Sequence, residues 1–406
     1  MSYARFKSNK AKVAAGLRPV RFMTDGAMHV LTDPATEKFS EIELVNDAAP
    51  VPAPVPTPVP TPAPVPPAGG IVVQIGGWNA VLGAARGGEV FIPADGNHGH
   101  LRIDNRAFPS TVTILGGEFQ SILFANTCKN ITIKDARVYE GVLAYNGSTN
   151  LTMDGLDIGV KGRENYRGWT REQWLTIAAG GIDLNEGPHV IRNCKLMGVK
   201  RGVIIGRGVL ENNRVAGCAG DGKWAGNDSR VEGNITYDYV QIDGNHGDSF
   251  QAGPCKNLTL KNNVTVEWVG DRTGHPAGDA GLTAGPLASI CQLQTDGLFD
   301  GMYENVTITG EMSAASQVNG ITIMGGINVL IENNTMVAIG DYTAGVLKPG
   351  INVSPHKNGT PSSNVRVRNN RAMQYSLSSG IVENTGNTVI TAAQREAVVA
   401  EVMARL

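Results

Sequence analysis

Short stretches in which apolar and polar residues alternate recur along most of the chain. Each stretch ends in a turn, often Asn-Asn, and a further short stretch follows it. Such alternation predicts β-strands that bury one face in a core. The stretches begin near residues 110, 129, 149, 188, 207, 229, 256, 304, 327 and 363.

A second set of short apolar stretches lies upstream of most of these and commonly follows a glycine. The second set begins near residues 121, 141, 181, 202, 249, 320 and 350. The two sets repeat together, in the shorter cases at about 19 to 23 residues, which is typical of a parallel β-solenoid. Val, Ile and Leu would fill the interior, and Asn side chains would stack along the axis at the turns.

The segment WNAVLGAARGGEVFIPADG, residues 78–96, predicts a short capping helix, a glycine turn and a first strand. With the repeat, this opening resembles that of right-handed parallel β-helix proteins of the pectate-lyase-like superfamily, although the tyrosine that often ends it is missing. The resemblance covers roughly residues 70–390 and implies an all-β, right-handed parallel β-helix. It implies no single activity, because the superfamily holds lyases, hydrolases, epimerases and non-catalytic adhesins.

Four parts follow along the chain: an N-terminal head (residues 1–49), a proline-rich stalk or linker (50–70), the β-helix (71–390) and a C-terminal helix (391–406). The head predicts strands on both sides of an Asp25-Gly26 turn and at FSEIELV. The stalk holds ten prolines in residues 50–67, which predicts a polyproline II rod. The final helix would begin at Thr391 and cover the open solenoid end or a neighbouring chain.

This layout of head, stalk and β-helix resembles phage-type spikes. The resemblance implies a homotrimer on the surface of a virion or virus-like particle, with residues 1–49 docked on a capsid or other particle protein. The first residues are basic but lack the apolar core of a signal peptide, so we expect synthesis in a bacterial cytoplasm without secretory export.

Composition narrows the range of partners. The net charge of the 406 residues is −2, which gives no electrostatic signature of nucleic-acid binding. No apolar stretch is long enough to insert into a membrane. The five cysteines are dispersed without a CxxC, which favours free thiols over a disulfide framework.

The register of the glycine-led strands predicts one row of outward side chains. The residue between two inward apolar residues points outward, and neighbouring coils stack about 4.8 Å apart. The predicted row is Leu123, Leu143, Asp183, Ile204, Gln251, Gln292, Thr322 and Asn352.

Three long interruptions of the repeat predict loops on one flank of the solenoid, where such folds place function. They are residues 160–180, 237–249 and 267–289. Their aromatic side chains, Trp169 and Trp174 among them, would contact sugar rings. Arg163 and Arg167 would bind acidic sugars, or would be a solvated loop face.

Two polar clusters are candidate catalytic groups. The stretch IDGNHGDSFQAG, residues 242–253, contains Asp243, His246 and Asp248, and the next loop contains Asp271, His275 and Asp279. These side chains could exchange protons or bind a divalent cation such as calcium, although the spacing is not that of an EF-hand. They could equally be polar turns that satisfy backbone donors. The predicted sugar-binding residues are Asp183, Gln251, Gln292, Gln294 and Asp296.

Three functions fit this pattern. The first is a virion-type spike that recognises cell-surface polysaccharide through the β-helix. The second is a polysaccharide hydrolase or lyase of the same fold, and the sequence leaves open whether the protein is an enzyme. A hydrolase needs two carboxylates about 5–5.5 Å apart for retention or 6.5–9.5 Å apart for inversion, whereas a lyase needs a base beside a bound cation. The third is a purely structural particle-decoration protein.

Overall fold

The computed structural model describes residues 3–6, 20–22, 28–33, 38–45, 69–159, 163–242, 247–269, 282–284, 288–293, 301–315, 319–339 and 348–406. The chain divides into two compact units, residues 1–65 and residues 66–406. Among the described residues, no helix is long and apolar enough to cross a membrane.

The first unit contains a four-stranded antiparallel sheet with the order β1-β4-β3-β2. Its strands are β1 (Tyr3–Phe6), β2 (Val20–Phe22), β3 (Met28–Asp33) and β4 (Lys38–Val45). Strands β2, β3 and β4 lie in the segments that the sequence predicted to be extended. The Asp25-Gly26 turn and most of the proline-rich stalk lie outside the described residues.

The second unit begins with a cap on a solenoid. Strand β5 (Ile71–Val73) precedes helix α1 (Trp78–Ala84), and β6 (Val90–Pro93) follows. Helix α1 buries Trp78 and Leu82, and the indole Nε1–H of Trp78 donates to Nδ1 of His98 (3.1 Å). The opening predicted from residues 78–96, a short helix followed by a first strand, is therefore confirmed.

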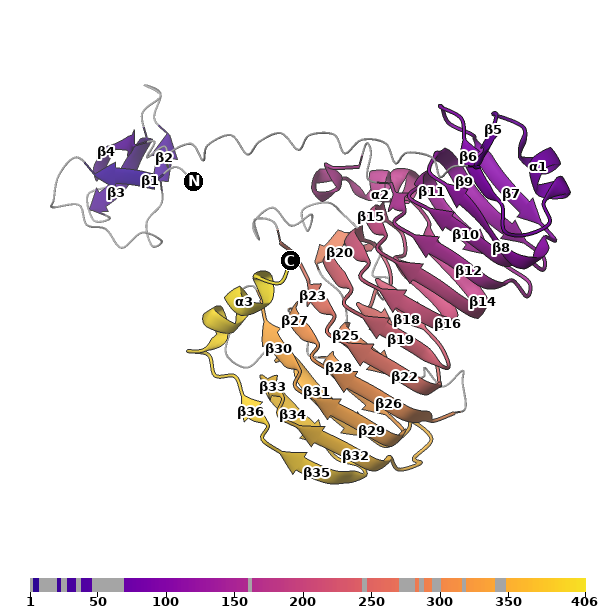
Figure 1. The fold of residues 1–406 in the computed structure, drawn as a ribbon. Helices are drawn as coiled ribbons and strands as arrows, with labels where there is room; N and C mark the ends of the chain where they lie inside the picture. Colours follow the sequence, from indigo (N-terminus) through magenta and orange to yellow (C-terminus); the bar gives the residue numbers. More distant parts are fainter. Residues whose placement is uncertain are drawn as a thin grey trace. The chain divides into compact units, whose positions relative to one another are not determined.

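The rest of the second unit is a parallel β-helix whose coils contribute strands to three long sheets (Figure 1). Sheet one contains β7 (His100–Asp104), the later parts of β9 (Glu118–Ala125) and β11 (Arg137–Ala144), the first parts of β14 (Gly181–Arg192) and β16 (Val203–Glu211), then β18 (Lys223–Ala225), β21 (Phe250–Gln251), β25 (Ala288–Leu293), β28 (Asn319–Met324), β31 (Gly350–Ser354) and β34 (Gln374–Leu377).

Sheet two follows in each coil. It contains β6, β8 (Ala107–Leu115), β10 (Lys129–Lys134), β12 (Thr149–Asp154), the later parts of β14 and β16, then β19 (Ser229–Glu232), β22 (Lys256–Lys261), β26 (Tyr303–Thr309), β29 (Gly326–Glu332), β32 (Ser363–Arg368) and β35 (Ile381–Thr385).

Sheet three closes the coil. It contains the first parts of β9 and β11, then β13 (Asp157–Ile158), β15 (Lys195–Val199), β17 (Arg214–Cys218), β20 (Ile235–Ile242), β23 (Val264–Val266), β27 (Met312–Ala315), β30 (Thr335–Ala338), β33 (Arg371–Ala372) and β36 (Thr388–Val389). One antiparallel addition, β24 (Leu282–Ala284), pairs with the end of β20.

Columns of aliphatic side chains fill the space between the three sheets. Successive coils stack equivalent residues, such as Ile122, Val142 and Ile182, in register, and all three are buried in the main apolar cluster. Phe250 also points inward and is 1% exposed, as its place in the repeat predicted. The right-handed parallel β-helix expected from the sequence is the fold of this unit.

Asparagines form an internal ladder at the corner between sheets two and three. The side-chain amide of one buried asparagine donates to the side-chain oxygen of the asparagine in the next coil, at 2.9 Å in the pairs Asn213–Asn234 and Asn234–Asn263. In each Asn-Asn turn the first residue has positive φ, 54° at Asn212 and 55° at Asn262, a conformation that asparagine tolerates. The recurrent dipeptide therefore combines a turn residue with a ladder residue.

A second, exposed ladder follows the corner between sheets one and two. The Nδ2 of Asn305 donates to Oδ1 of Asn257 (3.0 Å), Asn328 donates to Asn305 (2.8 Å), and Asn364 donates to Asn328 (3.0 Å). These amides link coils of unequal length.

Two helical segments cover the outer face of sheet three (Figure 1). Helix α2 (Arg171–Ile177) and the turn η1 (Tyr166–Gly168) lie over its middle coils. Helix α3 (Arg395–Met403) packs on β23, β27 and β30 through Val398, Val399 and Val402.

The start and the docking of α3 differ from the sequence prediction. The helix begins after Gln394, because the Gln394 side chain accepts hydrogen bonds from the backbone and hydroxyl of Thr391 and closes a turn there. Helix α3 covers the side of sheet three and not the open solenoid end, because the apolar outer face of the last coils offers Val264 and Val337 as partners.

Candidate functional site

The outward row of sheet one is continuous from coil to coil, and we call it the strip. Backbone pairing aligns its members in this order: Arg102, Leu123, Leu143, Asp183, Ile204, Trp224, Gln251, Gln292, Thr322, Asn352 and Ser376. The predicted row is thus confirmed in its order. The structure inserts Trp224 between Ile204 and Gln251, and it adds one polar residue at each end.

Trp224 is the aromatic member of the strip that the sequence reading missed. It lies on the three-residue strand β18, beside the buried Gly226. A Cβ at Gly226 would lie 2.4 Å from the carbonyl oxygen of Gly206, so close contact between coils requires glycine there. The half-buried indole therefore stands beside the backbone of a glycine.

Asp183 is the one carboxylate on the described strip. It lies between Leu143 and Ile204, and its Oδ1 atom is buried without a hydrogen bond to the described residues. Burial raises the pKa of Asp183, an effect that the charge of Arg201 partly offsets. An unpaired buried acceptor typically costs about 1–3 kcal/mol, so a ligand hydroxyl that reached this oxygen would relieve that cost.

The three long connections all leave the solenoid at one corner, between sheets three and one. They join β13 to β14, β20 to β21 and β23 to β25, so each precedes a strand that carries a member of the strip. The strip therefore runs beside this corner along its middle coils, as expected of loops on one flank.

Seven predicted site residues lie outside the described residues. These are Asp243, His246, Asp271, His275, Asp279, Gln294 and Asp296. The backbone of Gln292 is described and pairs with Gln251 and with Thr322. Gln251 is half-buried on β21.

Asp248 does not face an open groove, contrary to the expectation for a catalytic group. It is fully buried. Its backbone oxygen accepts from the N–H of Gly222 (2.8 Å), and its backbone N–H donates to Oδ1 of Asp221 (3.0 Å). The tight corner that leads onto β21 uses this residue to bind the preceding coil.

The prediction that Trp169 and Trp174 contact sugar is wrong. They are 3% and 0% exposed, and their rings meet edge to face at 5.0 Å between centroids. Both pack with Tyr166 and Ala216 over sheet three. The outer face of sheet three is apolar in these coils, so the loop buries its tryptophans against it and does not present them to solvent.

Arg163 and Arg167 anchor this loop instead of presenting a cationic surface for acidic sugars. Arg163 donates to the carbonyl oxygens of Tyr139 (2.7 Å) and Ile177 (2.9 Å). Arg167 donates to Oδ2 of the buried Asp238 (2.7 Å), which also accepts from the Tyr166 hydroxyl. Their donor groups are directed into the protein.

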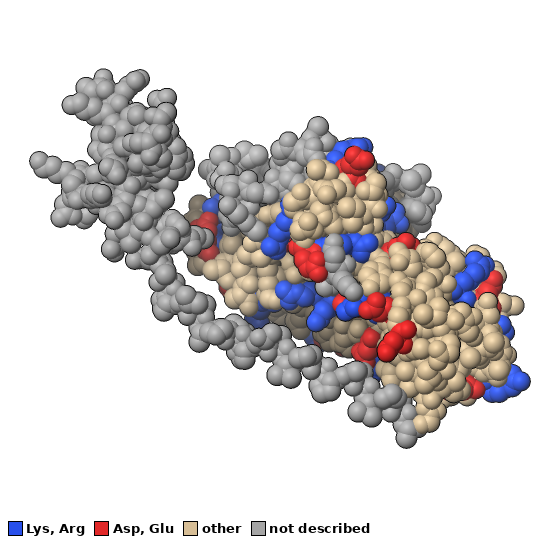
Figure 2. Space-filling view, turned by 90° about the horizontal axis from the view of Figure 1, so that it is seen from above, with Lys and Arg blue, Asp and Glu red and all other residues tan. Residues whose placement is uncertain are grey.

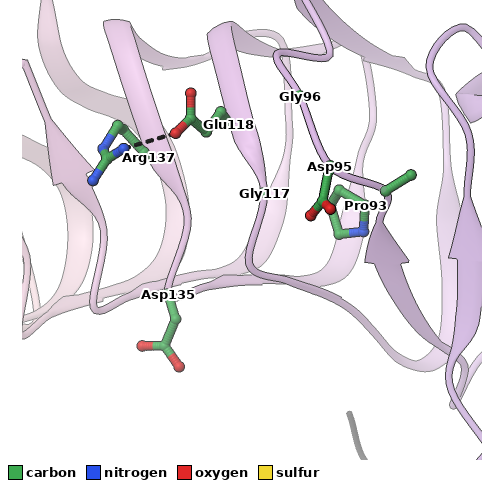
Figure 3. A pocket seen from close by; sticks show the side chains of 8 residues that line it. Pro93, Asp95, Gly96, Gly117, Glu118, Asp135 and Arg137 are labelled. Atoms are coloured by element: carbon green, nitrogen blue, oxygen red, sulfur yellow. Dashed lines mark hydrogen bonds and ion pairs between the residues drawn. The ribbon is translucent and has the colours of Figure 1, made fainter. Parts of the chain in front are cut away.

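A pocket of 330 Å³ lies at the corner of the first coils (Figure 3). Arg137 donates to Oε1 of Glu118 (2.7 Å), and the Tyr139 hydroxyl donates to Oε2 (2.7 Å). Figure 3 shows the Asp135 carboxylate pointing away from this pair. Both Glu118 oxygens therefore accept hydrogen bonds from side chains of β11 in the next coil.

The described residues give no support for a metal site. Within the described part of the chain, no group of three or more His, Cys, Asp or Glu side chains could hold a metal ion. The predicted divalent cation therefore stays a prediction.

Lys and Arg are interspersed with Asp and Glu over the described surface in Figure 2, and many pair between coils, such as Arg192 with Asp154 (2.9 Å).

A larger pocket of 390 Å³ lies at the first coil, beside α1 and β7. Its lining residues are Gly76, Trp78, Asn79, His98, His100, Leu101, Arg102 and Asp104. Because Arg102 is also the first member of the strip, this pocket is continuous with the row of outward side chains.

No family model and no curated protein matches the chain. Solved structures with a similar fold include the A-module of the Azotobacter vinelandii mannuronan C-5 epimerase AlgE6, with 14% identity over 80% of this chain and 97% of that chain (TM-score 0.39). Pectate lyase Pel9A shows 14% identity over 80% of this chain and 82% of that chain (TM-score 0.33). The Dettilon tailspike protein (gp208) shows 13% identity over 75% of this chain and 58% of that chain (TM-score 0.34).

These likenesses concern the fold alone. The register of the three sheets defines the class of protein, a parallel β-helix, which is the fold that the resemblance stated from the sequence implied. Activity and partners have to be argued from the strip and its surroundings.

Proposed function

We propose that the protein is a virion-type spike that recognises a cell-surface polysaccharide through the strip on sheet one. The observation that carries the proposal is the arrangement around Trp224. An indole stands beside glycine backbone, in register with the amide of Gln251 and with Asp183, whose Oδ1 has no hydrogen bond to the described residues. Sugar rings offer apolar C–H faces for stacking and hydroxyls for such acceptors.

The length of the strip fits an extended polymer better than a small molecule. Eleven members in register at about 4.8 Å per step span roughly 48 Å. Ile204 and Thr322 are only 7% exposed, so a polysaccharide would meet chiefly the other members, whose apolar, acidic and amide groups follow a fixed order. That order would set the specificity for one polysaccharide over another.

The proposal also includes the assembly expected from the layout. Residues 1–49 would dock on a capsid or other particle protein, and three chains would form a homotrimer at the particle surface. The support is the separate N-terminal sheet followed by the proline-rich segment. Deleting residues 1–67 should leave a folded β-helix that no longer joins its particle, and sedimentation should show trimers of the full chain.

The second candidate is a polysaccharide-degrading enzyme, favoured by the raised pKa of Asp183 on the strip. A carboxyl with a raised pKa can serve as a general acid. A hydrolase would need a partner carboxylate, for which Asp243, Asp271 and Asp279 are the candidates. A lyase would need a base and a divalent cation. A decoration protein, the third candidate, would need neither binding nor cleavage.

The deciding experiment compares variants on capsular polysaccharide from candidate hosts. Calorimetry should show Trp224→Ala binding at least 10-fold more weakly than the wild type, because a central aromatic typically dominates an interface. Leu330→Ala, on the outer face of sheet two, is the control and should bind normally. Release of reducing ends or absorbance of unsaturated sugars would identify an enzyme. Normal binding by Trp224→Ala would refute the strip as the recognition surface.

A further inference from the structure

The pocket beside β7 closes one end of the strip. Strand β7 is the first strand of sheet one, and it pairs with β9 on one side only. Helix α1 lies beyond it and contributes Trp78 and Asn79 to the lining. Figure 1 shows α1 and β7 together at this end of the solenoid. Because sheet one ends at β7, a polymer that follows the strip to this point would place one of its ends at the pocket.

Arg102 is held in a fixed orientation inside this pocket. Its Nη2 and Nε donate to Oδ2 of Asp104 at 2.9 and 3.3 Å, and Oδ1 of Asp104 accepts from Asn126 (2.6 Å). These hydrogen bonds, with the charge of Arg106, hold the pKa of Asp104 below its usual range. The Nη1 group of Arg102 makes no hydrogen bond to the described residues, and the side chain is 58% exposed. It is available to a ligand.

His100 supplies a second nitrogen on the same face. It precedes Arg102 by two positions, so the side chains are about 6.6 Å apart along the strand. Its Nδ1 lies 2.8 Å from the Ser121 hydroxyl and 3.9 Å from a Glu140 oxygen. The Nε2 atom has no hydrogen bond within the described part of the chain. A carboxylate between the two side chains could therefore accept one hydrogen bond from each.

His98 lines the pocket but is not a ligand-binding group. Its Nδ1 accepts from Trp78, and its Nε2 donates to the carbonyl oxygen of Ala94 (2.8 Å). Both ring nitrogens are therefore used to hold α1 and the following turn against the first coil. The ring forms a rigid wall, and the polar side chains that a ligand would meet are those of Asn79, His100, Arg102 and Asp104.

We propose that this pocket binds the carboxylate of an acidic monosaccharide, such as a uronic or sialic acid, at the end of the recognised polysaccharide. The link to a polymer rests on the proposed function of the strip. A volume of 390 Å³ suits one sugar ring. Asp104 and Glu140 are close to the two donors, and their negative charges oppose a doubly charged phosphate more strongly than a singly charged carboxylate.

The test uses acidic monosaccharides and their uncharged counterparts. The pairs are D-glucuronate with D-glucose, D-galacturonate with D-galactose, and D-mannuronate with D-mannose, and N-acetylneuraminate is a further acid. Calorimetry and saturation-transfer NMR on the full chain should show at least one acid binding at least 10-fold more tightly than its neutral counterpart. Arg102→Gln and His100→Gln should each weaken that binding, Arg102→Gln by at least 10-fold. Higher salt should also weaken it.

The control is Arg366→Gln, which removes an exposed arginine from the outer face of sheet two and should bind the acid as the wild type does. Unchanged melting temperatures would show that the variants are folded. The proposal is overturned if no acid is preferred over its counterpart, or if Arg102→Gln binds the acid normally.

A separate comparison distinguishes this proposal from the function proposed for the strip. Trp224→Ala should lose polysaccharide binding and keep acid binding. Acid binding without any polysaccharide binding would support the acid site in the pocket and refute the strip as a recognition surface. Polysaccharide binding without a preference for the acid would refute only the acid site in the pocket.

Discussion

Glu311 occupies a place in the internal asparagine ladder, and its charge state should control stability. Its Oε1 accepts from the backbone N–H (3.1 Å) and Nδ2 (2.8 Å) of Asn263, while its own N–H donates to Asn334 (2.9 Å). Burial raises the pKa of Glu311 to about 7, although the Asn263 hydrogen bonds and the charge of Lys223 oppose the shift. The ordinary value is 4.5, and a difference of this size corresponds to about 3 kcal/mol.

The sign of this effect follows from proton binding. A carboxyl whose pKa is higher in the folded chain than in the unfolded chain binds more protons when folded. Its stabilising contribution is fully present below pH 4.5 and is lost as the pH rises toward 7. Replacing Glu311 by Gln keeps the acceptor for Asn263 and removes the charge. We therefore expect Glu311→Gln to be more stable than the wild type by about 2–3 kcal/mol at pH 8 and nearly equal at pH 4.

The assay is urea unfolding of the full chain, followed by circular dichroism at several pH values between 4 and 8. The wild type should lose stability relative to Glu311→Gln across this interval. Glu172→Gln, at an exposed position on α2, is the control and should follow the wild type. If Glu311→Gln and the wild type show the same dependence on pH, the carboxyl is not neutral in the folded chain and the reasoning fails.

Three further predictions concern the solenoid. Burial lowers the pKa of His189 to about 4, below its ordinary 6.5, so stability should fall by about 3 kcal/mol as the pH drops from 6.5 to 4, and His189→Gln should remove this loss in the same urea assay. Gly202→Ala would place a Cβ 1.9 Å from the carbonyl oxygen of Gly222 and should cost about 1–3 kcal/mol, whereas Gly253→Ala, with open space around it, should unfold as the wild type does. Phe250→Ala should cost about 3–5 kcal/mol, and a thermal unfolding curve that coincides with that of the wild type would contradict its inward placement.

The periodic parts of the fold could be predicted from sequence because every coil repeats the same physical constraint. Alternation fixes which side chains point inward, so the order of the strip followed from register alone. Trp224 was missed because β18 has only three residues, too few to show alternation. Trp169 and Trp174 were predicted to contact sugar because the sequence does not show against which surface of the protein an apolar loop side chain is buried.

The ladder was predicted only in its general form. The sequence shows Asn-Asn at turns, which suggests side chains that stack along the axis. Gly310-Glu311 occupies the corresponding place in another coil, with positive φ at Gly310 (69°) in place of the first asparagine. Aligning this Gly-Glu with the Asn-Asn turns would have identified a buried acid. The catalytic candidates could not be placed in the same way, because long insertions follow no repeat.

The exposed ladder shows that the number of residues in a coil does not determine how far the solenoid advances along its axis. Asn257 and Asn305 are 48 residues apart in sequence, whereas Asn305 and Asn328 are 23 apart, yet each pair is joined by a direct amide hydrogen bond. The solenoid therefore advances by the same small step whether a coil is short or long. Genetic insertions at the loop-bearing corner could change the groups displayed there without altering the spacing between any two coils. Natural selection or protein engineering could therefore change the groups displayed at this corner while the axial spacing of the coils stays constant.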